Sequence, residues 1–172
     1  MRNFLSIFFI LLCLLSGCKK RQPDIDPVTP PATYTLYGSD ELTCYAINAS
    51  TGLKRWVFKS EYSLVGPPHV KNGMVFLKTE ESLFALDAVT GTKRWESKTR
   101  PVLFTITDKV VYIVNSKRKL YALDAITGTK KWEFTSDLNG TAYTMSPTIA
   151  NGLVYWVPMQ IQSMLLMQYR AQ

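Results

Sequence analysis

The 172-residue sequence has three cysteines and one histidine, and 19% of its residues are charged. Three cysteines are too few for a small secreted domain stapled by disulfides, and a single histidine excludes a histidine-rich metal site. One short apolar run near the N-terminus excludes a polytopic membrane protein. The 47% of hydrophobic residues are typical of a globular protein, and the length suggests one domain.

The N-terminal segment carries an export signal. Arg2 precedes an apolar run at residues 4–15, which as a helix would span about 18 Å, less than the hydrocarbon core of a bilayer. Residues 15–18, Leu-Ser-Gly-Cys, resemble a bacterial lipobox. The resemblance implies that residues 1–17 are a lipoprotein signal peptide, and that Cys18 becomes the acylated N-terminus and anchors the chain to a membrane. An ordinary secretory signal or an uncleaved anchor is the alternative interpretation.

Residues 18–33 contain four prolines and no apolar periodicity, which predicts a flexible tether between membrane and domain. The basic cluster Lys19, Lys20 and Arg21 either contacts anionic head groups or is simply solvated. Because the export signal would direct the chain out of the cytoplasm, we do not take the net charge of +7 as a sign of nucleic-acid binding.

The rest of the chain repeats one unit. Residues 44–56, 83–95 and 120–132 align without a gap, and their tryptophans are 39 and 37 residues apart. Upstream of each later motif lies a pair of turn residues and another apolar run, as in Asn72-Gly73 before residues 74–77. Each period therefore contains three or four short strands and no helical pattern. Four antiparallel strands in about 38 residues describe the blade of a β-propeller, an all-β fold.

The repeated residues suit such a blade. Both faces of the alternating Leu-Tyr-Ala-Leu-Asp-Ala segment are largely apolar, as expected for a strand between neighbouring sheets. An acidic or amide residue then accepts hydrogen bonds from turn amides, a glycine takes the left-handed conformation, and a tryptophan wedges between blades. These structural residues are Asn48, Asp87 and Asp124; Gly52, Gly91 and Gly128; and Trp56, Trp95 and Trp132.

The A-x-D-A-x-T-G-x-x-x-W pattern at 34–156 resembles the PQQ-like β-propeller repeat, named after pyrroloquinoline quinone. The first copy departs from it, with Cys44 and Asn48 at positions where the others have Leu and Asp. Together with the lipobox, the repeats look most like BamB-type outer-membrane lipoproteins. That family implies an eight-bladed propeller that scaffolds β-barrel assembly through protein contacts and binds no quinone.

The resemblance favours a non-enzymatic function. Quinoprotein dehydrogenases hold the quinone with Ca²⁺ and often have an adjacent Cys-Cys disulfide. This sequence has no Cys-Cys pair, its aspartates are accounted for by turns, and we expect no cofactor and no metal. We predict an envelope lipoprotein, lipid-anchored at the periplasmic face of the outer membrane, that serves as a scaffold for envelope proteins. A ligand-binding, glycan-binding or sensory propeller and a remnant of a quinoprotein dehydrogenase are the alternatives.

Three further features are a cysteine, the single histidine and the charged hairpin loops. Cys44 is expected to be a buried free thiol, and His69 to begin a strand. The charged runs Glu80-Glu81 and Lys117-Arg118-Lys119 fall in corresponding hairpin loops, which either are solvated or contact partners.

The C-terminal residues 157–172 lack the repeat motif, although a fourth Thr-Gly is due near residue 170. The repeat region holds fewer than four periods, and propellers typically close with four to eight. In a frame shifted by one base, each Met-Gln step reads as alanine, and the tail can encode a segment similar to residues 38–53. We therefore expect an aberrant, frame-shifted tail on an incomplete propeller.

Overall fold

The computed structural model describes residues 34–135, 143–156, 158–159 and 167–170. The chain divides into two units, 1–30 and 31–172, and the described residues all belong to the second. Every regular element among them is a β-strand. No helix in this part of the chain is long and apolar enough to cross a membrane.

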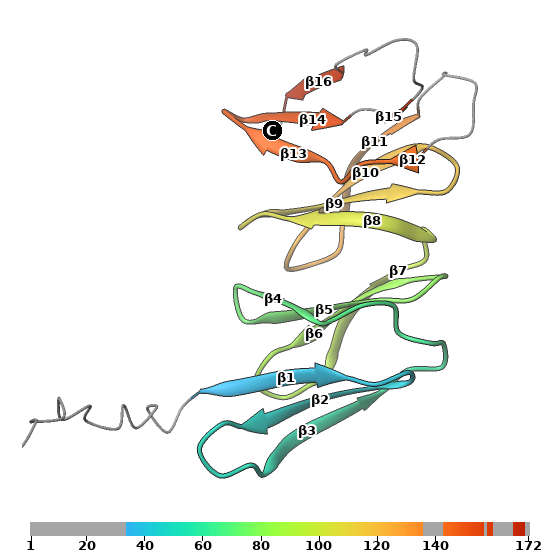
Figure 1. The fold of residues 1–172 in the computed structure, drawn as a ribbon. Coiled ribbons are helices and arrows are strands. Elements are labelled where there is room, and N and C mark those ends of the chain that lie inside the picture. Colours follow the sequence, from blue (N-terminus) through green and yellow to red (C-terminus); the bar gives the residue numbers. More distant parts are fainter. Residues whose placement is uncertain (1–33, 136–142, 157, 160–166, 171–172) are drawn as a thin grey trace, which may run out of the picture. The chain divides into compact units, whose positions relative to one another are not determined.

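The strands form consecutive antiparallel meanders, in which neighbours along the chain are neighbours in the sheet (Figure 1). Sheet I contains β1 (Thr35–Ser39), β2 (Thr43–Asn48) and β3 (Lys54–Lys59). Sheet II contains β4 (His69–Lys71), β5 (Met74–Lys78), β6 (Leu83–Asp87) and β7 (Lys93–Ser97). Sheet III contains β8 (Pro101–Ile106), β9 (Val110–Asn115), β10 (Lys119–Asp124) and β11 (Lys130–Thr135). Sheets II and III confirm the predicted four-stranded repeat.

The later strands depart from this order. Sheet IV contains β13 (Thr148–Ala150), β14 (Leu153–Trp156) and β16 (Met167–Arg170), and a small separate pair joins β12 (Tyr143–Thr144) to β15 (Pro158–Met159). β16 pairs with β14, with Arg170 opposite Leu153 and Met167 opposite Trp156. The segment without a repeat motif therefore supplies a strand, because backbone pairing does not require the motif's side chains.

The two strands of each repeat motif pair in the same register in all three copies. Ala46 faces Trp56, Ala85 faces Trp95, and Ala122 faces Trp132, with a bulge directly after each alanine. The turns before the central strands differ from the sequence expectation in one copy. Asn72-Gly73 and Asn151-Gly152 have positive φ at both residues, whereas Asp108 and Lys109 do not. There Thr107 closes the turn, and its amide donates to the carbonyl of Val110 at 2.9 Å.

Three apolar clusters connect successive sheets. Because side chains alternate along a strand, one set of central-strand residues faces the preceding sheet and the other set faces the next. Val75 and Leu86 of sheet II pack with Cys44 and Trp56 of sheet I, while Phe76 of sheet II belongs to the cluster shared with sheet III. A third cluster joins Tyr112 of sheet III to Val154 and Trp156 of sheet IV. This packing on both faces explains why strands such as β9 are buried along their whole length.

Sheet I has one uncovered face. Leu36 pairs with Ile47 as Val75 pairs with Leu86 in sheet II. Leu36 is 60% exposed, whereas Val75 is completely buried against sheet I. An apolar row that the repeat normally buries is therefore open to solvent on sheet I.

Candidate interaction surface

Each repeat motif builds the same tight turn at one end of its sheet. Asp87 Oδ1 accepts hydrogen bonds from the amides of Val89 and Thr90, both at 2.9 Å. Gly91 follows at a φ of 72°, in the left-handed region, and its amide donates to the carbonyl of Asp87 at 2.8 Å. Asn48 and Asp124 accept equivalent pairs of amide hydrogen bonds in sheets I and III. The turn thus needs a short side chain with an acceptor oxygen, followed by glycine.

The repeat tryptophan of one sheet docks onto this turn in the next sheet. Trp56 Nε1 donates to the carbonyl of Ala88 at 3.0 Å, and Trp95 Nε1 donates to that of Ala125 at 3.1 Å. A Cβ atom at Gly91 would lie 2.5 Å from the Trp56 ring, and one at Gly128 would lie 2.6 Å from the Trp95 ring. These glycines are therefore needed twice, for their backbone conformation and for the close approach of an indole.

The remaining repeat glycine and tryptophan, Gly52 and Trp132, do not form such a pair in the described part of the chain. A Cβ atom at Gly52 would meet no atom within 4 Å, since no tryptophan of a preceding sheet in the described part of the chain docks on this turn. Trp132 is half-buried, and its ring centroid lies 5.9 Å from that of Tyr112. The pairing of each tryptophan with the following repeat's glycine was missed in the sequence, although the identical offset between repeats contained that signal.

Charged side chains surround the turns of sheets II and III. Arg94 contacts Asp87 at 2.7 Å, and this bond, with the hydrogen bonds from the turn, holds the pKa of Asp87 well below its usual range. Lys131 lies 3.5 Å from Asp124, whose pKa is lowered first by the amide of Thr127. Burial raises the pKa of Glu96, but hydrogen bonds from Lys93 and Ser82 outweigh it, and the net shift is downward.

We expect Asp87→Asn to flatten the acid dependence of stability. A carboxyl with a lowered folded-state pKa stabilises the fold above its unfolded pKa, and this contribution is lost as the pH falls from about 5 toward 2. Asparagine keeps the turn, as Asn48 shows, but has no proton to release. Urea unfolding at several pH values in that range measures how steeply the free energy of unfolding falls with acid. The reciprocal Asn48→Asp should make this fall steeper, because Arg55 occupies the position of Arg94. An unchanged pH dependence in both variants would contradict the role assigned to Asp87.

The hairpin loops at the opposite end of the sheets carry exposed charges. Glu80 and Lys117 are exposed in equivalent loops of sheets II and III. Glu81 is held by Arg100 at 2.8 Å, and Lys119 contacts Glu133 at 3.2 Å. The loops therefore combine ion-paired charges, Glu81 and Lys119, with the exposed side chains of Glu80 and Lys117.

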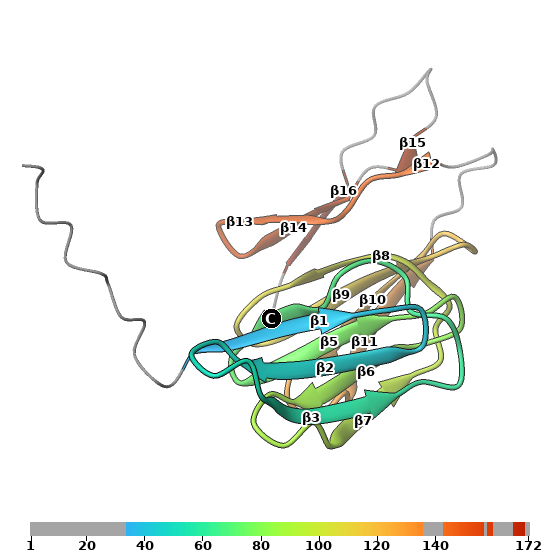
Figure 2. The same ribbon diagram turned by 60° about the horizontal axis from the view of Figure 1, so that its bottom comes forward.

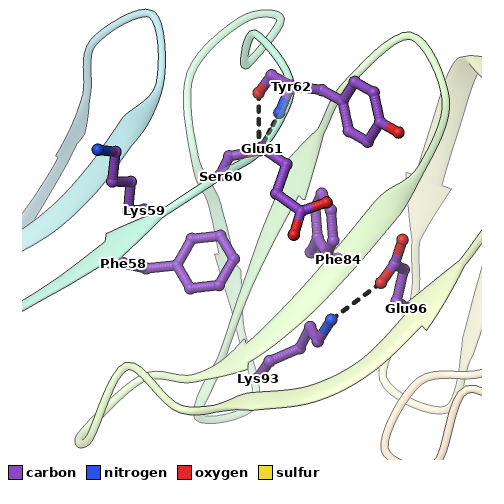
Figure 3. Close-up of a pocket in the computed structure, with 8 residues that line it drawn as sticks. All are labelled: Phe58, Lys59, Ser60, Glu61, Tyr62, Phe84, Lys93 and Glu96. Carbon is purple, nitrogen blue, oxygen red and sulfur yellow. Dashed lines mark hydrogen bonds and ion pairs between the residues drawn. The ribbon is translucent and has the colours of Figure 1, made fainter.

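A pocket of about 120 Å³ lies between sheets I and II (Figure 3). The ring centroids of Phe58 and Phe84 lie 5.8 Å apart, and Lys93 Nζ lies 5.6 Å from the centroid of the Phe84 ring. Lys93 also contacts Glu96 at 2.9 Å. The two charged side chains of sheet II in this pocket, Lys93 and Glu96, neutralise each other beside a small apolar floor, so the pocket resembles an inter-sheet gap more than a substrate site.

The remaining candidates for chemistry have structural surroundings. Cys44 is free and completely buried, and burial raises the pKa of its thiol to about 11. His69 begins β4, and its ring meets the edge of Phe104 at 4.9 Å. Among the residues that the structure describes, no group of three or more His, Cys, Asp or Glu side chains is placed to hold a metal ion. Cys18, the predicted lipidation site, lies outside them.

Comparison with solved structures shows the fold. BamB from Moraxella catarrhalis is 23% identical, with a TM-score of 0.57 over 71% of this chain and 43% of its own. The computationally designed Ika4 protein is 10% identical, with a TM-score of 0.61 over 80% of this chain and 86% of its own. The quinohemoprotein alcohol dehydrogenase ADHIIG from Pseudomonas putida HK5 is 17% identical, with a TM-score of 0.54 over 71% of this chain and 26% of its own. This chain thus spans less than half the length of the BamB structure.

Sequence comparison identifies the family. No curated protein sequence matches the chain significantly. A family model described as outer membrane protein assembly factor BamB matches residues 21–162, most of the chain and all three repeat motifs. The chain therefore belongs to the PQQ-like repeat family of the outer membrane protein assembly factor BamB, an all-β family of the bacterial envelope.

Proposed function

We propose that the protein is a non-enzymatic, lipid-anchored envelope scaffold that contacts the machinery assembling outer-membrane β-barrel proteins. The match to the BamB family model supports this role. The quinoprotein dehydrogenases share the fold, and the side chains described above support a scaffold in preference to an oxidoreductase. The residues that recur in each repeat have structural roles in turns and inter-sheet packing: Asp87 accepts hydrogen bonds in a turn, and Trp95 docks on the next sheet.

The loop end is the part of the surface that we assign to protein contact. Its exposed charges differ in sign between the sheets, with Glu80 in sheet II and Lys117 in sheet III. Such a pattern fixes the orientation of a partner through complementary charge more than it adds affinity. The buried strands behind the loops hold these charges on a rigid frame.

Anchoring and partner contact are tested separately in a Gram-negative host. Mass spectrometry of the mature chain should find diacylglycerol on Cys18, and Cys18→Ser should remain unacylated. Affinity purification in mild detergent should recover a subunit of the barrel-assembly machinery. The double variant Glu80→Lys/Lys117→Glu should reduce that recovery, whereas Val89→Asp, at the turn end, should preserve it. Purification without such a subunit, together with quinone-dependent oxidation of an alcohol, would contradict the scaffold role.

A further inference from the structure

The pocket between sheets I and II is bordered by the last strand of each sheet. Phe58 belongs to β3 and Glu96 to β7, and Figure 2 shows these strands at corresponding edges of their sheets. The volume of about 120 Å³ is below the about 300 Å³ of a small-molecule site. Such a space suits one amino-acid side chain, and both of its walls belong to sheets that the structure describes. The pocket is therefore a candidate contact for a single side chain of another protein.

The aromatic floor of the pocket is not a requirement of the repeat. Phe58 stands opposite Cys44 in sheet I, and Ser97 stands opposite Leu83 at the same repeat position of sheet II. Sheet II thus forms the same hairpin and turn without an aromatic side chain at this position. The pair of Phe58 with Phe84 is consequently a particular feature of the first two sheets, and its rings supply the apolar surface of the pocket.

The segment that leads from sheet I to sheet II is fixed beside this floor. Ser60 is 4% exposed, and its Oγ donates to the carbonyl of Tyr62 at 2.7 Å and accepts from the Tyr62 amide at 3.2 Å. The Ser60 amide donates to the carbonyl of Leu42 at 2.8 Å. Glu61 extends from this segment into the pocket (Figure 3). Because the backbone around Glu61 and Tyr62 is already ordered, binding there costs little further conformational entropy.

One lysine at the edge of the pocket shows the mode in which it holds a cation. Lys93 Nζ lies 5.6 Å from the centroid of the Phe84 ring and 2.9 Å from Glu96 Oε2, so it contacts a ring face and a carboxylate together. Glu61 is the second carboxylate of the pocket, and no lysine or arginine among the described residues lies within ion-pair distance of it. Lys59 also lines the pocket, but its ammonium points away from the Phe84 ring (Figure 3). Glu61 is therefore open to a cation from outside the chain.

We propose that this pocket receives an arginine side chain of the scaffold's protein partner. A planar guanidinium stacks on an aromatic face and pairs with a carboxylate at the same time, which favours arginine over lysine. Phe58 and the half-exposed Tyr62 supply the faces, and Glu61 supplies the carboxylate. Arginines seated in small pockets are among the residues that dominate protein–protein affinity. The inference rests on the proposed function for the existence of a partner, whereas the preference for arginine is a property of this chain alone.

The first test measures that preference on the full chain in a mild detergent. The probe is the peptide acetyl-Gly-Arg-Gly-amide, and its binding is followed through the backbone amide signals in NMR spectra. Signals of residues 58–62 should shift as the peptide is added. The same peptide with citrulline, which keeps the shape of arginine and lacks its charge, should bind about fivefold more weakly. Equal binding of the two peptides would overturn the proposal.

Two substitutions separate the contributions of the carboxylate and the rings. Glu61→Gln should weaken binding of the arginine peptide about fivefold, and Phe58→Leu, which keeps apolar volume without an aromatic face, about threefold. The control Glu41→Gln removes the same charge from the hairpin between β1 and β2, outside the pocket lining, and should change the affinity at most about twofold. Circular dichroism verifies that each variant is folded. Equal losses in Glu61→Gln and Glu41→Gln would mean diffuse attraction and would contradict a pocket for arginine.

The charge reversal Glu61→Arg extends the test to the partner. In the affinity purification from the Gram-negative host it should reduce recovery of the barrel-assembly subunit several-fold, because two cations then face each other in the pocket. Recovery equal to that of the unsubstituted chain would overturn the assignment of the pocket to this partner. Failure of the unsubstituted chain to recover any such subunit, with the preference for arginine over citrulline intact, would count against the proposed function and not against the arginine pocket.

Discussion

Replacing Trp95 by alanine should lower the free energy of unfolding by about 3–5 kcal/mol, the cost of truncating a buried tryptophan. The side chain is only 8% exposed and belongs to the cluster that joins sheets II and III. Its ring meets that of Phe76 at 5.9 Å, and its Nε1 donates to the carbonyl of Ala125. The substitution leaves a cavity and removes the hydrogen bond that this indole donates.

Chemical denaturation followed by circular dichroism measures the loss. The control Tyr62→Ala removes an aromatic ring that is 50% exposed, and it should cost at most about 1 kcal/mol. Similar losses in the two variants would mean that Trp95 does not connect the sheets.

Substitution of Gly128 by alanine should destabilise the protein by about 2–5 kcal/mol, although it adds a single methyl group. The residue has a φ of 72°, which strains any side chain, and the new Cβ atom would lie 2.6 Å from the Trp95 ring. The indole would have to move out of its position, which also weakens its hydrogen bond to Ala125.

Gly73 provides the matched control for backbone strain. It has the same φ of 72°, but a Cβ atom there would meet nothing within 4 Å. Gly73→Ala should therefore cost only the left-handed penalty of about 1–2 kcal/mol. If both substitutions cost the same, steric contact with the tryptophan makes no contribution.

Much of the fold is predictable from the sequence because its determinants are local. The acceptor at Asp87, the glycine at Gly91 and the alternating strand before them lie within one short segment, and each repeat contains the same segment. Repetition itself predicts stacking, because a sheet with two apolar faces needs a neighbour on each side.

Interactions between repeats are harder to predict, since they depend on which residues meet across sheets. Trp95 and Gly128 are far apart in sequence, and their contact requires the relative placement of sheets II and III. The pairing of β16 with β14 likewise has no side-chain signature. This pairing follows from the unpaired N–H and C=O groups at the edge of a sheet, which require hydrogen-bond partners.

The candidate surface was only partly predictable. The hairpin loops with Glu80 and Lys117 could be located from the alignment. The ion pairs of Lys93 with Glu96 and of Arg94 with Asp87 were not predicted, because they depend on which side chains meet within the folded sheet.

A double-mutant cycle between Trp95 and Gly128 tests most directly whether indoles dock on the glycine turns of the following sheet. Gly128→Ala should cost several kcal/mol in the wild-type protein. In the Trp95→Ala background, where the obstructing ring is absent, it should cost only about 1–2 kcal/mol, the left-handed strain. Additive losses in the double variant would show that the two residues do not touch, and would contradict the stacking of sheet II on sheet III.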